Sequence, residues 1–119
     1  MKLIIAGGRD YFPRHGDGQM IRRVVDQLDV TEIVSGTANG GDEIGEIFSF
    51  GMGKEPKRFP PDWDMWGKAA GPIRNKAMAD YGDVLLVFPG NSGTLNMIEQ
   101  AKKKGMRIYS ARFDKFLEY

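Results

Sequence analysis

The stretch VLLVFPGNSGTLNMIEQAKKKG, residues 84–105, joins an apolar run to an amphipathic segment through a turn of Pro, Gly, Asn and Ser. The apolar run is short and continuous, as is typical of a strand buried in a parallel sheet. The segment 94–104 has helical spacing and ends at Gly105 after three lysines, whose charge suits the C-terminal end of a helix. A strand, a turn and a helix in this order predict a βα unit of a parallel sheet.

The same alternation continues outward from this stretch over the whole chain. Short apolar runs bounded by glycine or polar turns predict strands over 2–7, 32–36, 84–90 and 107–111, with a weaker strand over 56–59. Segments of helical period predict helices over 20–28, 42–52, 67–80 and 94–104, with a short last helix over 114–118. The sequence therefore predicts an α/β fold, a Rossmann-like three-layer sandwich of about five mainly parallel strands with helices on both faces.

Length and composition narrow the class of protein. A chain of 119 residues with 41% hydrophobic content predicts a single domain over 1–119. The net charge of +1 provides no global field for nonspecific nucleic-acid binding, and the absence of Cys excludes disulfides and thiolate metal sites. The first apolar run is too short for a signal-peptide core, and no apolar stretch approaches the roughly 20 residues that span a bilayer. We expect a cytoplasmic protein with no membrane partner.

Three of the expected strands end in glycine-rich turns. AGGRD at 6–10 follows the first strand, SGTANGGDEIG at 35–45 the second, and PGNSGT at 89–94 the fourth. Each turn alone fits a tight loop without a ligand. Because the carboxyl ends of parallel strands share one sheet edge, where ligands bind in such folds, we expect the three turns to form one site. None of them is a Walker A loop or a complete GxGxxG fingerprint.

The segments GGRD, VSGTANGGD, FPPDWDMWGKAAGPIRNKAMAD and FPGNSGT resemble, in order and spacing, the YpsA-related branch of the SLOG superfamily. This Rossmann-like group also includes the Lonely-guy phosphoribohydrolases and the DprA single-strand-binding proteins. The resemblance extends from Leu3 to about Tyr109, and PGNSGT resembles the PGGxGT phosphate loop of the phosphoribohydrolases. It implies a nucleotide-like ligand near a subunit interface, and hence a homodimer or higher homo-oligomer.

Candidate ligand contacts follow from the chemistry of the turns. Backbone N–H groups and two hydroxyls before the last long helix suit a phosphate, although a helix opened and capped by Thr94 would use the same residues. Arg9 is either a charge partner of the ligand or a solvated side chain. Asp10 contacts either a ribose or its own turn. Asp42 either accepts hydrogen bonds from sugar hydroxyls or provides a favourable charge at a helix start. The candidates are Gly7, Gly8, Arg9, Asp10, Gly36, Thr37, Ala38, Gly41, Asp42, Trp63, Arg74, Asn75, Pro89, Gly90, Asn91, Ser92, Gly93 and Thr94.

The long specific segment contributes an arginine and an aromatic ring. Pro72 suits an early helical position, so we expect Arg74 and Asn75 in the first turn of a helix beside the sheet edge. A guanidinium there either holds a phosphate bidentately or forms a surface salt bridge. Trp63, in an expected loop, either stacks on a base or belongs to the core.

The choice between binding protein and enzyme depends on one position. The phosphoribohydrolase motif carries a Glu three residues after its Thr, and Met97 stands there, where a thioether cannot transfer protons. We therefore expect a nucleotide-binding sensor, carrier or sequestering protein. The alternative is a nucleotide-processing enzyme, such as an N-glycosidic phosphoribohydrolase, that uses Asp10, Asp42 or a bound water. Single-stranded nucleic-acid binding is the least favoured class. The paired carboxylates of Asp62 and Asp64 could bind Mg²⁺, but no further metal-ligand pattern in the sequence supports such a site. We expect no cofactor.

Overall fold

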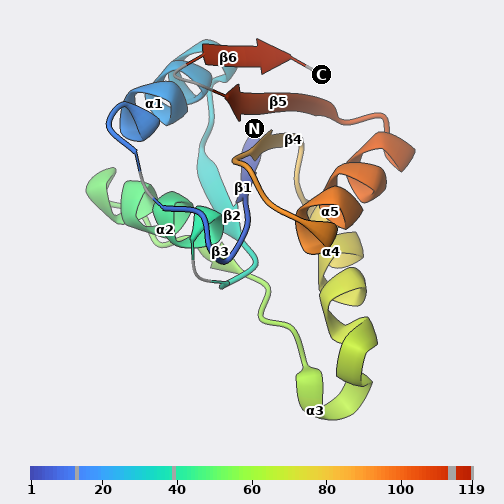
Figure 1. Cartoon of the computed structure of the whole chain (residues 1–119). Coiled ribbons are helices and arrows are strands. Elements are labelled where there is room, and N and C mark those ends of the chain that lie inside the picture. The colour runs from blue at the N-terminus through green and yellow to red at the C-terminus, as the bar shows by residue number, and fades with distance from the viewer. Residues whose placement is uncertain (13, 39, 113–114, 119) are drawn as a thin grey trace.

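One sheet of six strands, in the order β3-β2-β1-β4-β5-β6, forms the middle layer of the computed structural model (Figure 1). The structure describes residues 1–12, 14–38, 40–112 and 115–118. The last strand, β6 (Lys115–Glu118), pairs antiparallel with its neighbour, and the other pairings are parallel. The parallel strands are β1 (Lys2–Ala6), β2 (Glu32–Ser35), β3 (Lys57–Arg58), β4 (Val84–Val87) and β5 (Arg107–Arg112).

Helices cover both faces of this sheet, which confirms the predicted Rossmann-like three-layer sandwich (Figure 1). On one face lie α1 (Asp17–Leu28) and α2 (Gly41–Gly51), and on the other α4 (Ala70–Tyr81) and α5 (Ser92–Lys103). Among the described residues, none of the helices has both the length and the apolar character that crossing a bilayer requires.

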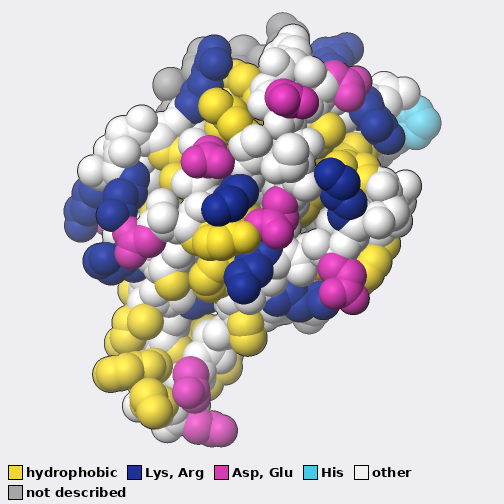
Figure 2. Space-filling model, turned by 180° about the vertical axis from the view of Figure 1, so that it is seen from behind, with side chains coloured by type: hydrophobic (Ala, Val, Ile, Leu, Met, Phe, Trp, Pro, Cys, Tyr) yellow, Lys and Arg dark blue, Asp and Glu magenta, His cyan; other side chains and the backbone are white. Residues whose placement is uncertain are grey.

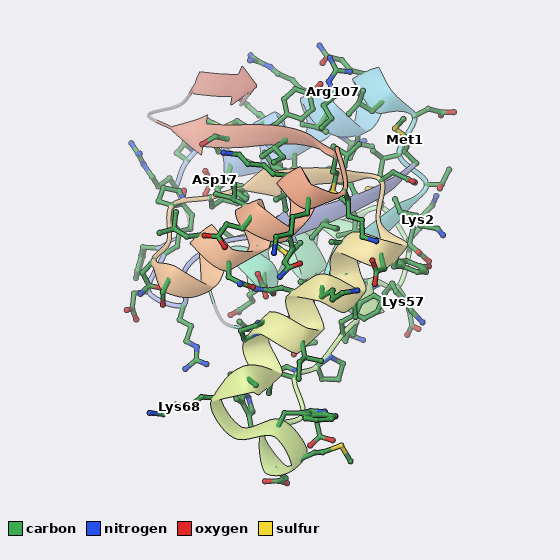
Figure 3. All side chains as sticks on the ribbon, turned by 90° about the vertical axis from the view of Figure 1, so that its right-hand side faces the viewer. Met1, Lys2, Asp17, Lys57, Lys68 and Arg107 are labelled. Carbon is green, nitrogen blue, oxygen red and sulfur yellow. The ribbon has the colours of Figure 1, made fainter. Side chains whose placement is uncertain are left out.

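A short arm, residues 63–69, projects beyond the sheet before α4 begins (Figures 1 and 3). It consists of the helix α3 (Trp63–Trp66) and the 3₁₀ turn η1 (Gly67–Ala69). The expected helix over 67–80 is therefore a 3₁₀ turn followed by an α-helix that continues to Tyr81. The arm extends the α4 side of the molecule away from its core.

The apolar run of β1 supplies two separate cores. Leu3 and Ile5 belong to the cluster under α1 and α2, whereas Ile4 and Ala6 belong to the cluster under α4 and α5. Successive side chains of a strand point to opposite faces, so a strand covered on both faces must be apolar at every position. This requirement explains why the central strands could be predicted from continuous apolar runs.

The order of the strands reverses at β1. The chain proceeds from β1 to β2 and β3 on one side, and then crosses to β4 and β5 on the other side of β1. Leu3 of β1 therefore lies beside both Ile33 of β2 and Val84 of β4. In open α/β sheets the loops diverge to opposite faces at such a switch point and leave a crevice beyond the carboxyl ends of the strands.

The predicted short helix over 114–118 is wrong. Residues Lys115–Glu118 form β6, in which Glu118 lies opposite Tyr109 of β5, while residue 114 lies outside the described part of the chain. Without β6, the outer side of β5 would be a sheet edge with unpaired N–H and C=O groups. The tertiary requirement to cover that edge therefore outweighs the local preference of this segment.

Candidate functional site

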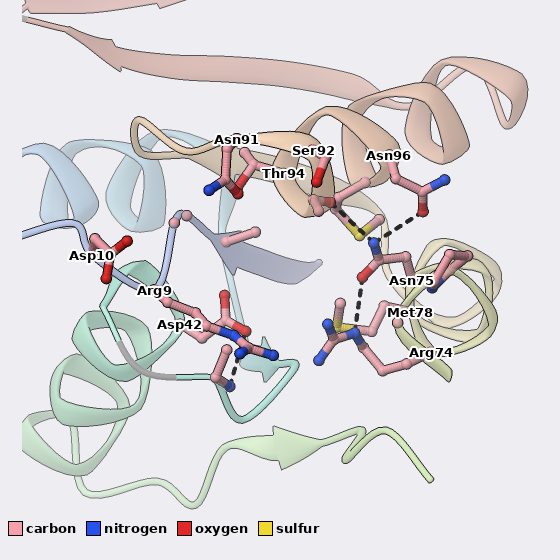
Figure 4. Close-up of a pocket in the computed structure, with 18 of the residues that line it drawn as sticks. Arg9, Asp10, Asp42, Arg74, Asn75, Met78, Asn91, Ser92, Thr94 and Asn96 are labelled. Carbon is pink, nitrogen blue, oxygen red and sulfur yellow. Dashed lines mark hydrogen bonds between the residues drawn. The ribbon is translucent and has the colours of Figure 1, made fainter. Parts of the chain in front are cut away.

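A cavity of about 600 Å³ opens at the switch point, beyond the carboxyl ends of β1 and β4 (Figure 4). Its volume lies in the range of small-molecule sites. The three glycine-rich turns and the helix α4 form its walls, as the sequence predicts for a site at this edge. The predicted contacts that line it are Gly7, Gly8, Arg9, Asp10, Ala38, Asp42, Trp63, Arg74, Asn75, Asn91, Ser92, Gly93 and Thr94.

The glycines of the three turns bring backbone against backbone. A Cβ added to Gly7 would lie 2.9 Å from the Cα of Gly41, and a Cβ added to Gly8 would lie 2.9 Å from the Cα of Gly90. The N–H of Gly8 also donates to the carbonyl of Pro89 at 2.9 Å. Gly41, Pro89 and Gly90 are absent from the cavity lining and form the layer behind it. A side chain at Gly41 or at Gly90 would push the turns apart.

The turn after β2 is shaped by strain. Thr37 has a φ of 66°, a left-handed conformation that is rare for a β-branched residue. Its N–H donates to Ser35 Oγ at 3.0 Å, and that hydroxyl donates to Glu46 of α2 at 2.7 Å. A Cβ on Gly36 would lie 2.8 Å from Oδ2 of Asp42. The predicted contacts Gly36 and Thr37 thus lie behind the cavity wall and place Asp42 at the cavity.

The first turn of α5 presents backbone donors to the cavity. The helix begins at Ser92, two residues earlier than the predicted opening at Thr94, because Asn91 and Ser92 also suit a helix start. The side chain of Asn91, at the N-cap, makes no capping hydrogen bond, and the first backbone bond of the helix runs from Leu95 N–H to the carbonyl of Asn91 at 2.9 Å. The N–H groups of Ser92, Gly93 and Thr94 precede that bond, at the positive end of the helix dipole.

Asn75 joins α4 to this turn. Its side chain is 3% exposed, and its Nδ2 donates to the carbonyl of Gly93 at 3.2 Å and to Oδ1 of Asn96 at 3.0 Å. Its Oδ1 accepts a hydrogen bond from Nε of Arg74 at 2.8 Å (Figure 4). The amide of Asn75 is thus engaged within the protein, where it orients the guanidinium and the α5 turn relative to each other.

Arg74 stands in the second turn of α4, which corrects the expectation of the first. The helix begins at Ala70, so Pro72 is its third residue, where a missing N–H does not break a helical bond. Nη1 of Arg74 donates to the carbonyl of Gly36. The salt bridges among the described residues lie elsewhere, so the surface-salt-bridge alternative for Arg74 does not hold. Burial lowers the pKa of Arg74, which the nearby Asp42 opposes.

Asp42 is a buried carboxyl group at the cavity. It is 4% exposed, and its Oδ2 accepts the N–H of Ala38 at 3.2 Å (Figure 4). Burial raises the pKa of Asp42 to about 6, against the opposing effects of the N–H groups of Ala38 and Gly7 and of the charge of Arg74. This carboxyl therefore changes its charge just below neutral pH.

The arm forms one rim of the cavity. Trp63 is 48% exposed and lies in α3, so neither the expected loop nor the core alternative describes it. The guanidinium of Arg9 lies 5.8 Å from the centroid of the Trp63 ring, within cation–π range. Asp62 accepts the N–H of Met65 at 3.1 Å and thereby caps α3. Among the described residues, no three His, Cys, Asp or Glu side chains are placed to hold a metal ion.

Several residues that line the cavity are not among the ligand contacts predicted from the sequence. Met97 and Met78 are each 1% exposed and form an apolar part of the wall. Asn96 lies one helical turn after Ser92, so its place could have been inferred from helical spacing. The others come from the arm, from the start of α4 or from the end of β1, and they are Ala6, Lys68, Gly71 and Pro72.

The fold and the cavity define a Rossmann-like α/β domain with a polar site at its switch point. The chain is 38% identical over 84 residues to the Gene 61 protein of Mycobacterium phage D29. This alignment covers 64% of the chain and 67% of the phage protein, so the chain belongs to the same family as that protein. No protein-family model matches the sequence.

The burial of Asp42 predicts a pH-dependent effect of Asp42→Asn on stability. The pKa of this carboxyl is about 6 in the folded chain against 3.8 for an ordinary Asp. Its contribution to stability is therefore complete below pH 3.8 and is lost as the pH rises through about 6. The difference between the two pKa values corresponds to about 3 kcal/mol. The free energy of unfolding of Asp42→Asn, relative to wild type, should therefore increase by up to about 3 kcal/mol between about pH 4 and about pH 7.5.

Urea unfolding at the two pH values measures this difference. Glu43→Gln is the matched control, because Glu43 is exposed in the same first turn of α2 and lies outside the cavity lining. Its effect on stability should show no comparable rise with pH. A difference between Asp42→Asn and wild type that is the same at both pH values would contradict the burial of an ionisable Asp42.

Proposed function

We propose that this chain binds a nucleotide or nucleotide-derived small molecule, as a sensor, carrier or sequestering protein. The observation that carries the proposal is the first turn of α5, where the N–H groups of Ser92, Gly93 and Thr94 lie in the wall of a cavity of about 600 Å³. An anion at the positive end of a helix satisfies such donors. A phosphate group of the ligand would occupy this turn.

The other side chains of the cavity support the same proposal. Three cationic side chains, Arg9, Lys68 and Arg74, line it together with the acidic Asp10 and Asp42. When both carboxylates are ionised, the cations still exceed them by one charge, which favours an anionic ligand. The half-exposed ring of Trp63 at the rim offers a surface on which a base would stack.

The motifs that resemble the YpsA-related SLOG proteins contribute to this one cavity. Lining residues come from GGRD, from VSGTANGGD, from the long segment with Arg74 and from FPGNSGT. We therefore propose membership of that branch. Figure 2 shows Lys and Arg side chains interspersed with Asp and Glu on one face of the molecule, without the continuous basic stripe that favours single-stranded nucleic acid.

Gly93→Val should strongly weaken ligand binding without unfolding the protein. A Cβ at Gly93 meets no atom within 4 Å, so the fold accommodates the larger side chain, but a β-branched group would stand where the phosphate approaches the backbone. Loss of a charge-assisted hydrogen bond predicts an affinity roughly ten- to a hundredfold lower. Mass spectrometry of small molecules released on denaturation identifies a co-purified ligand, and titration calorimetry with nucleoside 5′-monophosphates measures affinity.

Gly51→Val is the matched control for this variant. Gly51 is also helical, a Cβ there also meets no atom within 4 Å, and the residue ends α2 outside the cavity lining. The control should bind as wild type does, and both variants should melt near the wild-type temperature. Unchanged affinity of Gly93→Val for a nucleotide that wild type binds would place the phosphate elsewhere.

A nucleotide-processing enzyme, such as an N-glycosidic phosphoribohydrolase, is the second candidate, and Asp42 is the observation that favours it. Its carboxyl, with a pKa of about 6, is suited to proton transfer near neutral pH. Met97 in the cavity wall cannot supply the proton transfer of the Glu it replaces.

As a binding protein, the wild-type chain should release no base from nucleoside monophosphates, and Met97→Ala should give the same null result. Chromatographic detection of the free base tests this. Base release by wild type that is retained in Met97→Ala and lost in Asp42→Asn would replace the binding protein by an enzyme with Asp42 as its proton-transfer group.

We also propose that the chain forms a homodimer or a larger homo-oligomer through the arm. Two of its apolar side chains are at least half exposed, with exposed fractions of 68% for Met65 and 50% for Trp66. Hydrophobic side chains gather on this projection in Figure 2. Exposed apolar patches of this kind mark interfaces, and burying them against a second copy removes them from water.

Light scattering at micromolar protein should therefore give particles of at least twice 13.3 kDa. Met65→Lys should shift them toward the monomer mass, because a charge in an apolar interface loses its hydration. Ile47→Lys changes a similarly exposed side chain, 63% accessible on α2, and should leave the particle mass unchanged. Particles of 13.3 kDa alone would refute this interface.

A further inference from the structure

The surroundings of Asp42 indicate which class of nucleotide the cavity binds, an assignment that rests on the proposed function. Asp42 lines the cavity from the first turn of α2 although its side chain is only 4% exposed. An ionised carboxylate is an acceptor of hydrogen bonds, with about four lone-pair sites. The Ala38 N–H, bound at 3.2 Å, and the Gly7 N–H are its backbone donors, so acceptor capacity remains for a ligand.

The ligand group that meets Asp42 must be a donor. A phosphate brings negative charge and acceptor oxygens, which a carboxylate repels, so the phosphate belongs at the α5 turn and not here. The guanidinium of Arg74 lies nearby but donates to the carbonyl of Gly36 and to Oδ1 of Asn75. Sugar hydroxyls are neutral donors that an ionised carboxylate binds well, and they avoid burying a further charge.

The start of α2 and the loop into α5 meet at one residue of the first turn, Gly8. Its carbonyl accepts the N–H of Gly41, the residue before Asp42, at 3.3 Å, and its N–H donates to the carbonyl of Pro89 at 2.9 Å. Gly7 packs against Gly41, since a Cβ added to Gly7 would lie 2.9 Å from the Cα of Gly41. Neither Gly7 nor Gly8 has a side chain that could stand between the carboxylate and the phosphate turn. A ribose 5′-phosphate carries its ring hydroxyls and its phosphate at opposite ends of the same sugar.

We propose that Asp42 accepts hydrogen bonds from the ribose hydroxyls of the bound nucleotide, so that the site selects ribonucleotides over 2′-deoxyribonucleotides. A deoxyribose would cover the carboxylate without supplying the 2′ donor, and a buried acceptor left unpaired is unfavourable. The ribonucleotide should bind roughly ten- to a hundredfold more tightly than its 2′-deoxy counterpart.

The selectivity should depend on pH in a known direction. The ionised carboxylate is the better acceptor, so the preference for ribose is present above about pH 6 and falls as Asp42 is protonated below it. The charged groups that act on Asp42 are Arg74 from α4, which lowers its pKa, and Glu46 on its own helix, which raises it. The ratio of the two affinities is insensitive to titration of the phosphate, because both ligands carry the same phosphate.

The test compares adenosine, guanosine, cytidine and uridine 5′-monophosphates with their 2′-deoxy counterparts by titration calorimetry at about pH 8 and about pH 5. The preference of wild type for the ribonucleotide should be roughly ten- to a hundredfold at the higher pH and several times smaller at the lower. Asp42→Ala should bring the ratio close to one, and Asp42→Asn should reduce it, because a neutral amide oxygen is the weaker acceptor.

Glu43→Gln, which removes an exposed carboxylate one residue along the same turn, should keep the wild-type ratio. Binding of the deoxynucleotide by the Asp42 variants reports that they are folded. Equal affinities of wild type for the two series would overturn the ribose assignment and leave nucleotide binding intact. A preference that persists in Asp42→Ala would also overturn it, and failure of all the nucleotides to bind wild type would overturn the proposed function together with this inference.

Discussion

The contact of backbone on backbone between the three strand-end turns is the constraint on which the site depends. Gly7 touches Gly41 and Gly8 touches Gly90, so the loop after β1 is held between the start of α2 and the loop into α5. Side chains at these positions would separate the turns and remove the shared wall of the cavity. The glycines therefore serve mainly to let the backbones of the turns contact one another. This close approach places the starts of α2 and α5 at the same cavity.

A second constraint links the two helices on the far side of the site. Asn75 is buried, and its amide connects Arg74 to the carbonyl of Gly93 and to Asn96. Holding a guanidinium and a helix start in fixed relative positions reduces the conformational freedom that a ligand would otherwise have to remove on binding. Arg74 and the α5 turn are therefore preorganised as one unit.

The chemistry of the cavity comes at the expense of stability. Asp42 is buried so deeply that desolvation raises its pKa to about 6, despite two backbone N–H groups and the nearby guanidinium of Arg74. Thr37 beside it holds a left-handed backbone conformation, with a φ of 66°. Strained backbone and poorly solvated charge are both unfavourable in the unliganded protein, and they occur together at this cavity.

The sequence by itself determined the layers of this fold, because each buried strand needs apolar residues on both faces and each covering helix needs one apolar face. It also placed the three glycine-rich turns on one edge, since parallel strands end together. It could not reveal that Gly41, Pro89 and Gly90 form a layer behind the cavity, or that Asn75 joins two helices, because these are contacts between segments far apart in the chain. Tertiary structure alone decided that residues 115–118 form the strand β6, because pairing with the open edge of β5 outweighed the local sequence pattern. It also decided the raised pKa of Asp42, which depends on how much water the neighbouring residues exclude.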